Sequence, residues 1–191
     1  MQKATKTQAL TTEQREHLAY QTFQWWREVF IQGRRFLDAL DADTEDDPWT
    51  GNSPIGSFVA EKLFLITAIH HAIEHLEKLD YEMVRFGPSP FTQVFFEIEK
   101  VAPLEDIRNL RNMNEHSLDY LAGTGYMQDR YQSIVGRNGV SFITNAAWTI
   151  VHSGANILLV GNVPIDCLLS TMKEQFPYVQ SKTKEIFMRG A

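Results

Sequence analysis

The stretch that decides the fold runs from Thr12 to Leu40 and reads TEQREHLAYQTFQWWREVFIQGRRFLDAL. Small or apolar residues recur in it at alternating steps of four and three, at Ala19, Phe23, Trp26, Phe30, Gly33, Leu37 and Leu40. This spacing places them on one face of an α-helix. Thr11 and Gln14 have the spacing of a capping box, which fits a helix that begins at Thr12. We therefore expect a long amphipathic helix that needs a partner helix, in this chain or in a second copy.

Three more helices are expected before residue 123. They are predicted over about 57–86, 91–101 and 104–121. Their ends coincide with glycine and proline, because proline disrupts a helix interior and glycine suits a helix C-terminus. Together with the first helix they predict an antiparallel helical bundle over residues 11–123.

The residue pattern changes from helical to strand-like after Gly123. Short runs rich in β-branched residues lie at 131–135, 140–144, 147–152 and 156–160, separated by glycine-containing turns. They predict a small antiparallel β-meander. A last helix is expected from Pro164 to about Phe176, where Pro177 would break it, followed by a short basic helix near 181–189. The fold class is therefore mainly α, with the β-meander and C-terminal helices over 124–191.

Length and composition indicate one globular domain. The 191 residues are 43% hydrophobic and 22% charged, which is typical of a soluble protein. We expect a single domain over 11–191 after a loose polar tail at 1–10. Apolar stretches such as 63–69 fall well short of the ~20 residues that span a bilayer, and the N-terminus shows no secretory signal. A cytoplasmic protein with no membrane partner is the expectation, and the single cysteine, Cys167, excludes an intrachain disulfide.

The net charge of −6 argues against a general nucleic-acid binder, but the acid is concentrated in one segment. Five of the 24 acidic residues lie between Asp41 and Asp47, in a turn-rich loop over 41–56. Without them 24 − 5 = 19 acids face 18 bases, a balance of −1. A broad basic surface is still missing, so non-specific, salt-driven binding to RNA is expected to be poor.

The segment 103–123, PLEDIRNLRNMNEHSLDYLAG, sorts its side chains by face. One face of the expected helix carries Ile107, Leu110, Met113, Asn114, Ser117, Leu118 and Leu121, and the opposite arc carries Arg108, Arg111, Asn112, Glu115, His116 and Asp119. A solvated face with i,i+4 pairs such as Arg111–Glu115 is one interpretation of this arc.

The string Arg111-Asn112-Met113-Asn114-Glu115-His116 supports a second interpretation. An arginine, a polar residue directly after it and a histidine five places after the arginine resemble the signature of HEPN domains. The continuation through Asp119, Tyr120 and Gly123 is also similar to that family. HEPN domains are small antiparallel helical bundles that carry the signature on a late helix, which agrees with its place here.

The resemblance implies a metal-independent endoribonuclease or an RNA-binding module that acts as a homodimer without a cofactor, with prokaryotic defence or stress response as the expected setting. His116 would transfer protons, Arg111 would bind the phosphate, and Asn112 would orient one or both. Arg108, Glu115, Asp119 and Tyr120 would support them. These residue types suit the chemistry, because histidine titrates near neutral pH and arginine's planar fork matches phosphate oxygens. HEPN toxins paired with nucleotidyltransferase antitoxins carry a tyrosine two places after the histidine, where this chain has Leu118, so the sequence does not support an antitoxin partner.

Two other functions remain open. A non-catalytic dimerisation or adaptor bundle would use the same helices without chemistry. A metal-binding bundle is the weaker alternative, in which His71 and His75, spaced i,i+4 on a helix, would be the ligands. In this interpretation His70 borders the apolar face and is a partly buried structural histidine. Hydrolase chemistry is not indicated, since the sequence has no Gly-x-Ser-x-Gly nucleophile elbow.

Overall fold

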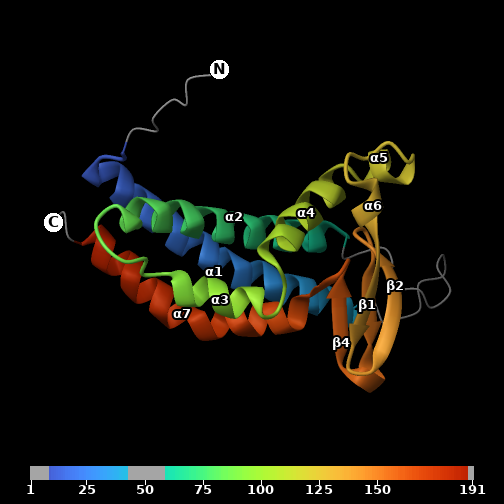
Figure 1. The fold of residues 1–191 in the computed structure, drawn as a ribbon. Coiled ribbons are helices and arrows are strands. Elements are labelled where there is room, and N and C mark those ends of the chain that lie inside the picture. The colour runs from blue at the N-terminus through green and yellow to red at the C-terminus, as the bar shows by residue number, and fades with distance from the viewer. Residues whose placement is uncertain (1–8, 43–58, 189–191) are drawn as a thin grey trace, which may run out of the picture.

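A computed structural model describes residues 9–42 and 59–188 of the chain. Three long helices form its body, α1 (Thr12–Ala42), α2 (Val59–Val84) and α7 (Ile165–Phe187), and α1 packs against both of the others (Figure 1). The shorter helix α3 (Thr92–Glu99) packs on α7, and α4 (Leu104–Glu115) packs on α2. The mainly α class is confirmed. The expectations for the tail at 1–8 and for most of the acidic loop lie outside the described residues.

The first helix begins as the sequence predicts. The Thr11 amide donates to Gln14 Oε1 at 2.9 Å, and the Gln14 amide donates to Thr11 Oγ1 at 3.2 Å, which is the reciprocal capping box. Most of the predicted face finds its partners within the chain: Trp26 is fully buried, and its indole donates to the Ala72 carbonyl of α2. Leu37 departs from the prediction, because it is 40% exposed. Gly33 faces α7, where an added Cβ would lie 3.2 Å from the Leu169 methyl carbons.

The predicted break at Pro177 is wrong, because α7 runs through this proline to Phe187. A proline inside a helix removes one hydrogen bond and costs about 3 kcal/mol. Burial on both sides of it offsets this cost: Leu168 and Met172 before it and Val179 and Thr183 after it are buried. One residue earlier, Phe176 stacks on a ring of α1 at 5.9 Å between centroids.

The strands lie together at one end of the helical body and are antiparallel, as expected, but they form two sheets (Figure 1). The first sheet pairs β1 (Gln132–Arg137) with β2 (Val140–Asn145), and the second has the order β3-β4-β5. Its strands are β3 (Thr149–His152), β4 (Ile157–Val160) and β5 (Val163–Pro164). Residues 138–139 have φ of 51° and 75°, the left-handed pair that a two-residue hairpin turn requires. A short helix, α6 (Gln128–Tyr131), leads into β1.

The expected helix over 104–121 is interrupted at His116. Its φ of −107° and ψ of 29° leave the α-helical region, so α4 ends at Glu115 and α5 (Ser117–Leu121) takes a new direction. Two buried contacts account for this. The Asn114 amide donates to the Leu110 carbonyl and, at 2.7 Å, to the Ala146 carbonyl beyond β2, which anchors the end of α4 to the β-region.

The second contact decides which side of α5 is buried. Tyr120 is buried and stacks on Tyr131 with 5.1 Å between ring centroids. On a continuous helix Leu118 and Leu121 would face the core, but here they are 79% and 68% exposed. Their predicted place on the apolar face is therefore wrong. Within the described residues, no helix is long and apolar enough to cross a membrane.

Candidate functional site

The polar arc of α4 begins at Arg111, which is half-buried. Its Nη2 lies 2.8 Å from Glu115 Oε1, one helical turn on. Its Nη1 donates to Asn112 Oδ1 over 3.5 Å, a weak contact. The Asn112 carbonyl in turn accepts the His116 amide at 3.1 Å. Asn112 therefore contacts the arginine weakly through its side chain, and its bond to the His116 amide is the ordinary main-chain bond of a helical turn.

His116 occupies the break between α4 and α5 and presents its ring to solvent. The side chain is 65% exposed, and its Nδ1 lies 3.6 Å from Asp119 Oδ2. This distance is too long for a direct hydrogen bond and suits a contact through a bridging water. The interruption of the helix frees the imidazole from the helix face, so the ring stands where a ligand can reach it.

Two of the expected supporting residues lie elsewhere. Arg108 forms an ion pair with Glu77 of α2, so it links the two helices. Tyr120 is buried, and its hydroxyl accepts the Met127 amide at 3.3 Å. It anchors α5 and does not share the surface of His116. Glu115 and Asp119 do contact the motif, the former through Arg111 and the latter through His116.

Among the histidines of α2, His71 and His75 lie with 5.9 Å between their ring centroids, as their i,i+4 spacing predicts. His75 Nδ1 donates to the His71 carbonyl at 2.8 Å, so this nitrogen is engaged within the helix. The group that comes together is His70, His71 and Glu74, whose ligand atoms lie within 4.8 Å of one another. Burial lowers the pKa of His70, with the carboxylate of Glu74 opposing and the charge of Arg111 adding to the effect. His70 thus lies within electrostatic range of the α4 motif, which the sequence did not indicate.

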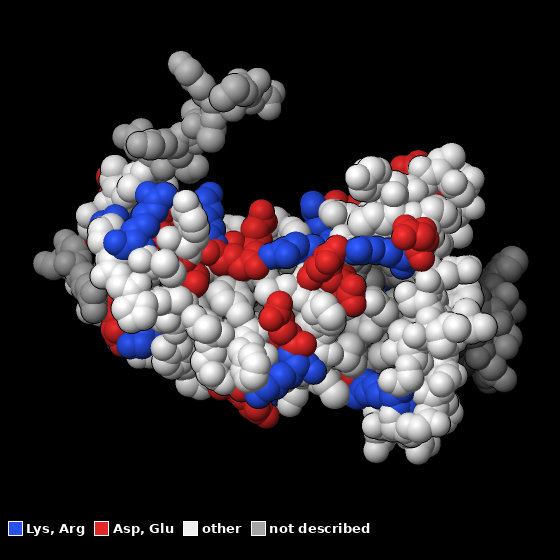
Figure 2. All heavy atoms as spheres, in the orientation of Figure 1, with Lys and Arg blue, Asp and Glu red and all other residues white. Residues whose placement is uncertain are grey.

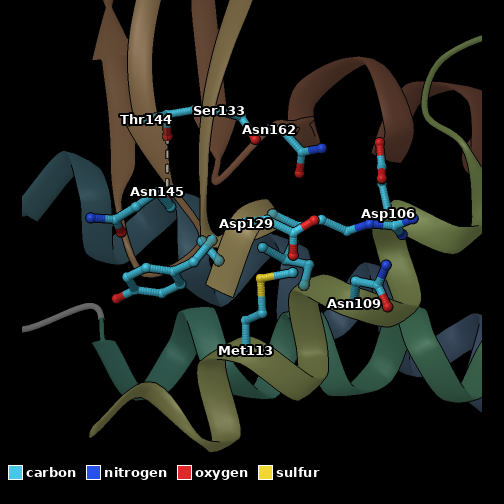
Figure 3. A pocket seen from close by; sticks show the side chains of 12 residues that line it. Asp106, Asn109, Met113, Asp129, Ser133, Thr144, Asn145 and Asn162 are labelled. Carbon is cyan, nitrogen blue, oxygen red and sulfur yellow. Dashed lines mark hydrogen bonds between the residues drawn. The ribbon is translucent and has the colours of Figure 1, made fainter. Parts of the chain in front are cut away.

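A polar pocket of about 220 Å³ lies on another side of α4, against α6 and the strands. Asp106 and Asn109 of α4, Asp129 of α6 and Asn162 of the turn after β4 reach toward a common space, as Figure 3 shows. Leu110 and Met113 supply an apolar part of its lining. Its carboxylates and amides suit a small ligand with several hydrogen-bond donors. The lining includes none of Arg111, Asn112 and His116, so the motif and the pocket occupy different faces.

Sequence reasoning missed the residues that complete these surfaces because each comes from a distant segment. Asn162 and Asp129 join α4 only through the folding of the β-region, and no local spacing marks them. Glu77 and Glu74 had a weak signal, since they repeat along one side of α2 with His70 at steps of four and three.

The charge pattern around the motif is mixed. On the face drawn in Figure 2, basic and acidic side chains are interleaved. Comparison of the chain with protein-family models, with curated proteins and with solved structures found no match. The geometry of the chain itself therefore carries the functional argument.

Proposed function

We propose that the chain is a HEPN-like RNA-processing protein that acts as a homodimer and cleaves RNA without a metal ion. One observation carries the proposal. The Arg111–His116 motif ends at a break in the helix, where a solvent-exposed imidazole follows an arginine that Asn112 and Glu115 hold. A proton-transfer group and a fixed cation on one short segment are the minimum that RNA transesterification needs.

In the proposed reaction the imidazole of His116 accepts the proton of the ribose 2′-hydroxyl. The 2′-oxygen then bonds to phosphorus as the bond to the 5′-oxygen breaks. The leaving 5′-oxygen takes a proton from a second, protonated imidazole, that of the other copy. The products are a 2′,3′-cyclic phosphate and a 5′-hydroxyl, so atoms and charge balance without an added reactant. Arg111 would stabilise the extra negative charge on the phosphate oxygens through its planar fork.

The surface beside His116 favours a second copy of the chain as partner. Leu118 and Leu121 follow the histidine on α5 and are largely exposed, and Tyr126 beyond them is almost fully exposed. We infer that these side chains form one apolar surface, since contiguous apolar surfaces mark interaction sites. Two copies that meet through α5 would bring both imidazoles close together. A cleft formed in this way would place Arg111 of both copies around the RNA. Binding would then not need a broad basic surface, which the face drawn in Figure 2 lacks.

The experiment compares RNA cleavage by the full chain with that of His116→Ala and Arg111→Ala, in buffer that contains a chelator. His116→Ala is expected to lose at least about 100-fold in rate, the usual contribution of a proton-transfer group. Arg111→Ala is expected to lose about as much, because it removes the cation that stabilises the transition-state charge. His152→Ala is the matched control, because this histidine is exposed on β3 and belongs to neither α4 nor α5. Equal cleavage by wild type and His116→Ala would contradict the proposal.

The second candidate function is a non-catalytic dimerisation or adaptor bundle, which the exposed leucines of α5 also favour. Leu118→Glu distinguishes the two functions. If the variant becomes monomeric by light scattering and RNA cleavage disappears with the dimer, the catalytic function is supported. A dimer of the wild-type chain with no cleavage of single-stranded or structured RNA would support the adaptor function.

A further inference from the structure

The cluster of His70, His71 and Glu74 on α2 is not used by the proposed RNA chemistry. His71 Nδ1 lies 3.4 Å and His70 Nε2 lies 3.7 Å from the same atom, Glu74 Oε2. Both spacings are longer than a good hydrogen bond, so neither imidazole is satisfied by the carboxylate. Three donor atoms of the types that bind transition metals therefore converge without bonding to one another.

These spacings agree with those around a metal ion. Zinc is bound by histidine nitrogen and carboxylate oxygen at about 2.0–2.2 Å, and tetrahedral geometry then places neighbouring ligand atoms about 3.3–3.6 Å apart. The measured 3.4 and 3.7 Å lie at or just beyond this range. The third separation, between the two imidazole ligand atoms, is no more than 4.8 Å.

Burial supplies an independent reason for a ligand. His71 Nδ1 is inaccessible to solvent and has no hydrogen-bond partner. A buried polar atom without a partner costs about 1–3 kcal/mol, which coordination to a metal would remove. The ring is held in place by Trp25 of α1, whose centroid lies 4.5 Å away. The nitrogen thus lies 3.4 Å from Glu74 Oε2 without forming a hydrogen bond to it.

The neighbouring arginines do not use the carboxylate of the cluster. Arg108 pairs with Glu77, and Arg111 pairs with Glu115. Each guanidinium therefore has a carboxylate of its own, and Glu74 contributes its negative charge to the cluster.

We propose that His70, His71 and Glu74 form a binding site for a divalent transition-metal ion, with Zn²⁺ as the ion that their chemistry fits best. Two imidazoles and one carboxylate leave the fourth position of a tetrahedral ion open to water or to another ligand. The cluster shares no residue with the Arg111–His116 motif, so the experiments on RNA cleavage and on metal binding can be read separately.

The test is equilibrium dialysis of the full-length chain, first freed of metal by a chelator, against ZnCl₂ alone. One ion per chain is expected to bind, and Glu74→Gln should weaken binding by at least about tenfold, since even the outer partners of metal ligands are worth 10–100-fold. Glu74 is exposed, so this variant keeps the fold. His17→Ala, which changes an exposed histidine of α1, is the control and should bind zinc as the wild type does.

Thermal unfolding with and without zinc gives a second readout. Zinc should raise the Tm of the wild type and of His17→Ala, because an ion that binds only the folded state stabilises it, and should leave Glu74→Gln and His71→Gln unchanged. Zinc binding that is equally strong in the wild type and Glu74→Gln would overturn the site. Absence of stoichiometric zinc in the wild type would overturn it as well.

Discussion

Asn114→Ala is the substitution whose effect can be worked out most fully from the structure. The side chain is 7% exposed, and its amide donates at 2.9 Å to the Leu110 carbonyl and at 2.7 Å to the Ala146 carbonyl. Each hydrogen bond contributes about 1 kcal/mol net, and a buried carbonyl left without a partner costs about 1–3 kcal/mol. The Leu110 carbonyl lies within a helix, so the loss falls mainly on the Ala146 carbonyl. The free energy of unfolding should therefore fall by about 2–4 kcal/mol.

Urea denaturation followed by circular dichroism measures this change, and the midpoint should move without a change in slope. In a thermal scan the same loss corresponds to a fall in Tm of roughly 4–16 °C for a chain of this size. Asn112→Ala is the matched control on the same helix, because its side chain makes only the 3.5 Å contact with Arg111. Its effect should stay within about 0.5 kcal/mol. If Asn114→Ala is as stable as this control, the anchor between α4 and the β-region does not exist.

Three further perturbations test other parts of the fold. Gly161→Ala should lower the free energy of unfolding by about 1–3 kcal/mol in urea denaturation, because φ is +58° and the new Cβ would lie 2.8 Å from a leucine methyl carbon of α4. Gly87→Ala is the control, since open space surrounds this glycine, and its stability should not change. Equal effects of the two substitutions would refute the close approach. Arg137→Lys should lower the free energy of unfolding by about 1–2 kcal/mol, since the guanidinium donates two hydrogen bonds, of 2.8 and 2.7 Å, to a carboxylate of α7. Arg34→Lys, in an exposed ion pair, should change the stability little. A similar loss in both variants would contradict the stronger contribution of the Arg137 pair. Burial lowers the pKa of Lys62 below 10.5, so the unfolded chain binds this proton more tightly than the folded chain does. The stability of the wild type relative to Lys62→Met should therefore rise as the pH approaches 10.5. A difference in stability that does not depend on pH would refute the lowered pKa.

Local patterns predicted the helical part of the fold well. The capping box and the alternating steps of four and three gave α1 its start and its buried face, because both features act within one or two turns. The failures come from tertiary contacts. Pro177 was predicted to end a helix, but the buried residues on both sides of it keep α7 continuous. His116 was placed inside a helix, and the anchoring of Asn114 and Tyr120 in the β-region breaks it there.

The candidate site was predictable only where its residues are close in sequence. Arg111, Asn112, Glu115 and His116 lie within two turns, so their contacts follow from helix geometry. The approach of His70 to the α4 motif depends on how α2 and α4 cross, which no spacing in the sequence records. The spacing of four residues favoured His71 with His75 as ligands, whereas the structure also brings the ligand atoms of His70, His71 and Glu74 within 4.8 Å of one another.

The most direct test of the proposed function is the chemical nature of the RNA ends that the purified chain produces in the presence of a chelator. Fragments with 2′,3′-cyclic phosphate and 5′-hydroxyl ends are expected from the wild type and from His152→Ala, and none from His116→Ala. Fragments with 5′-phosphate ends, or cleavage that survives the loss of His116, would contradict a metal-independent mechanism centred on this motif.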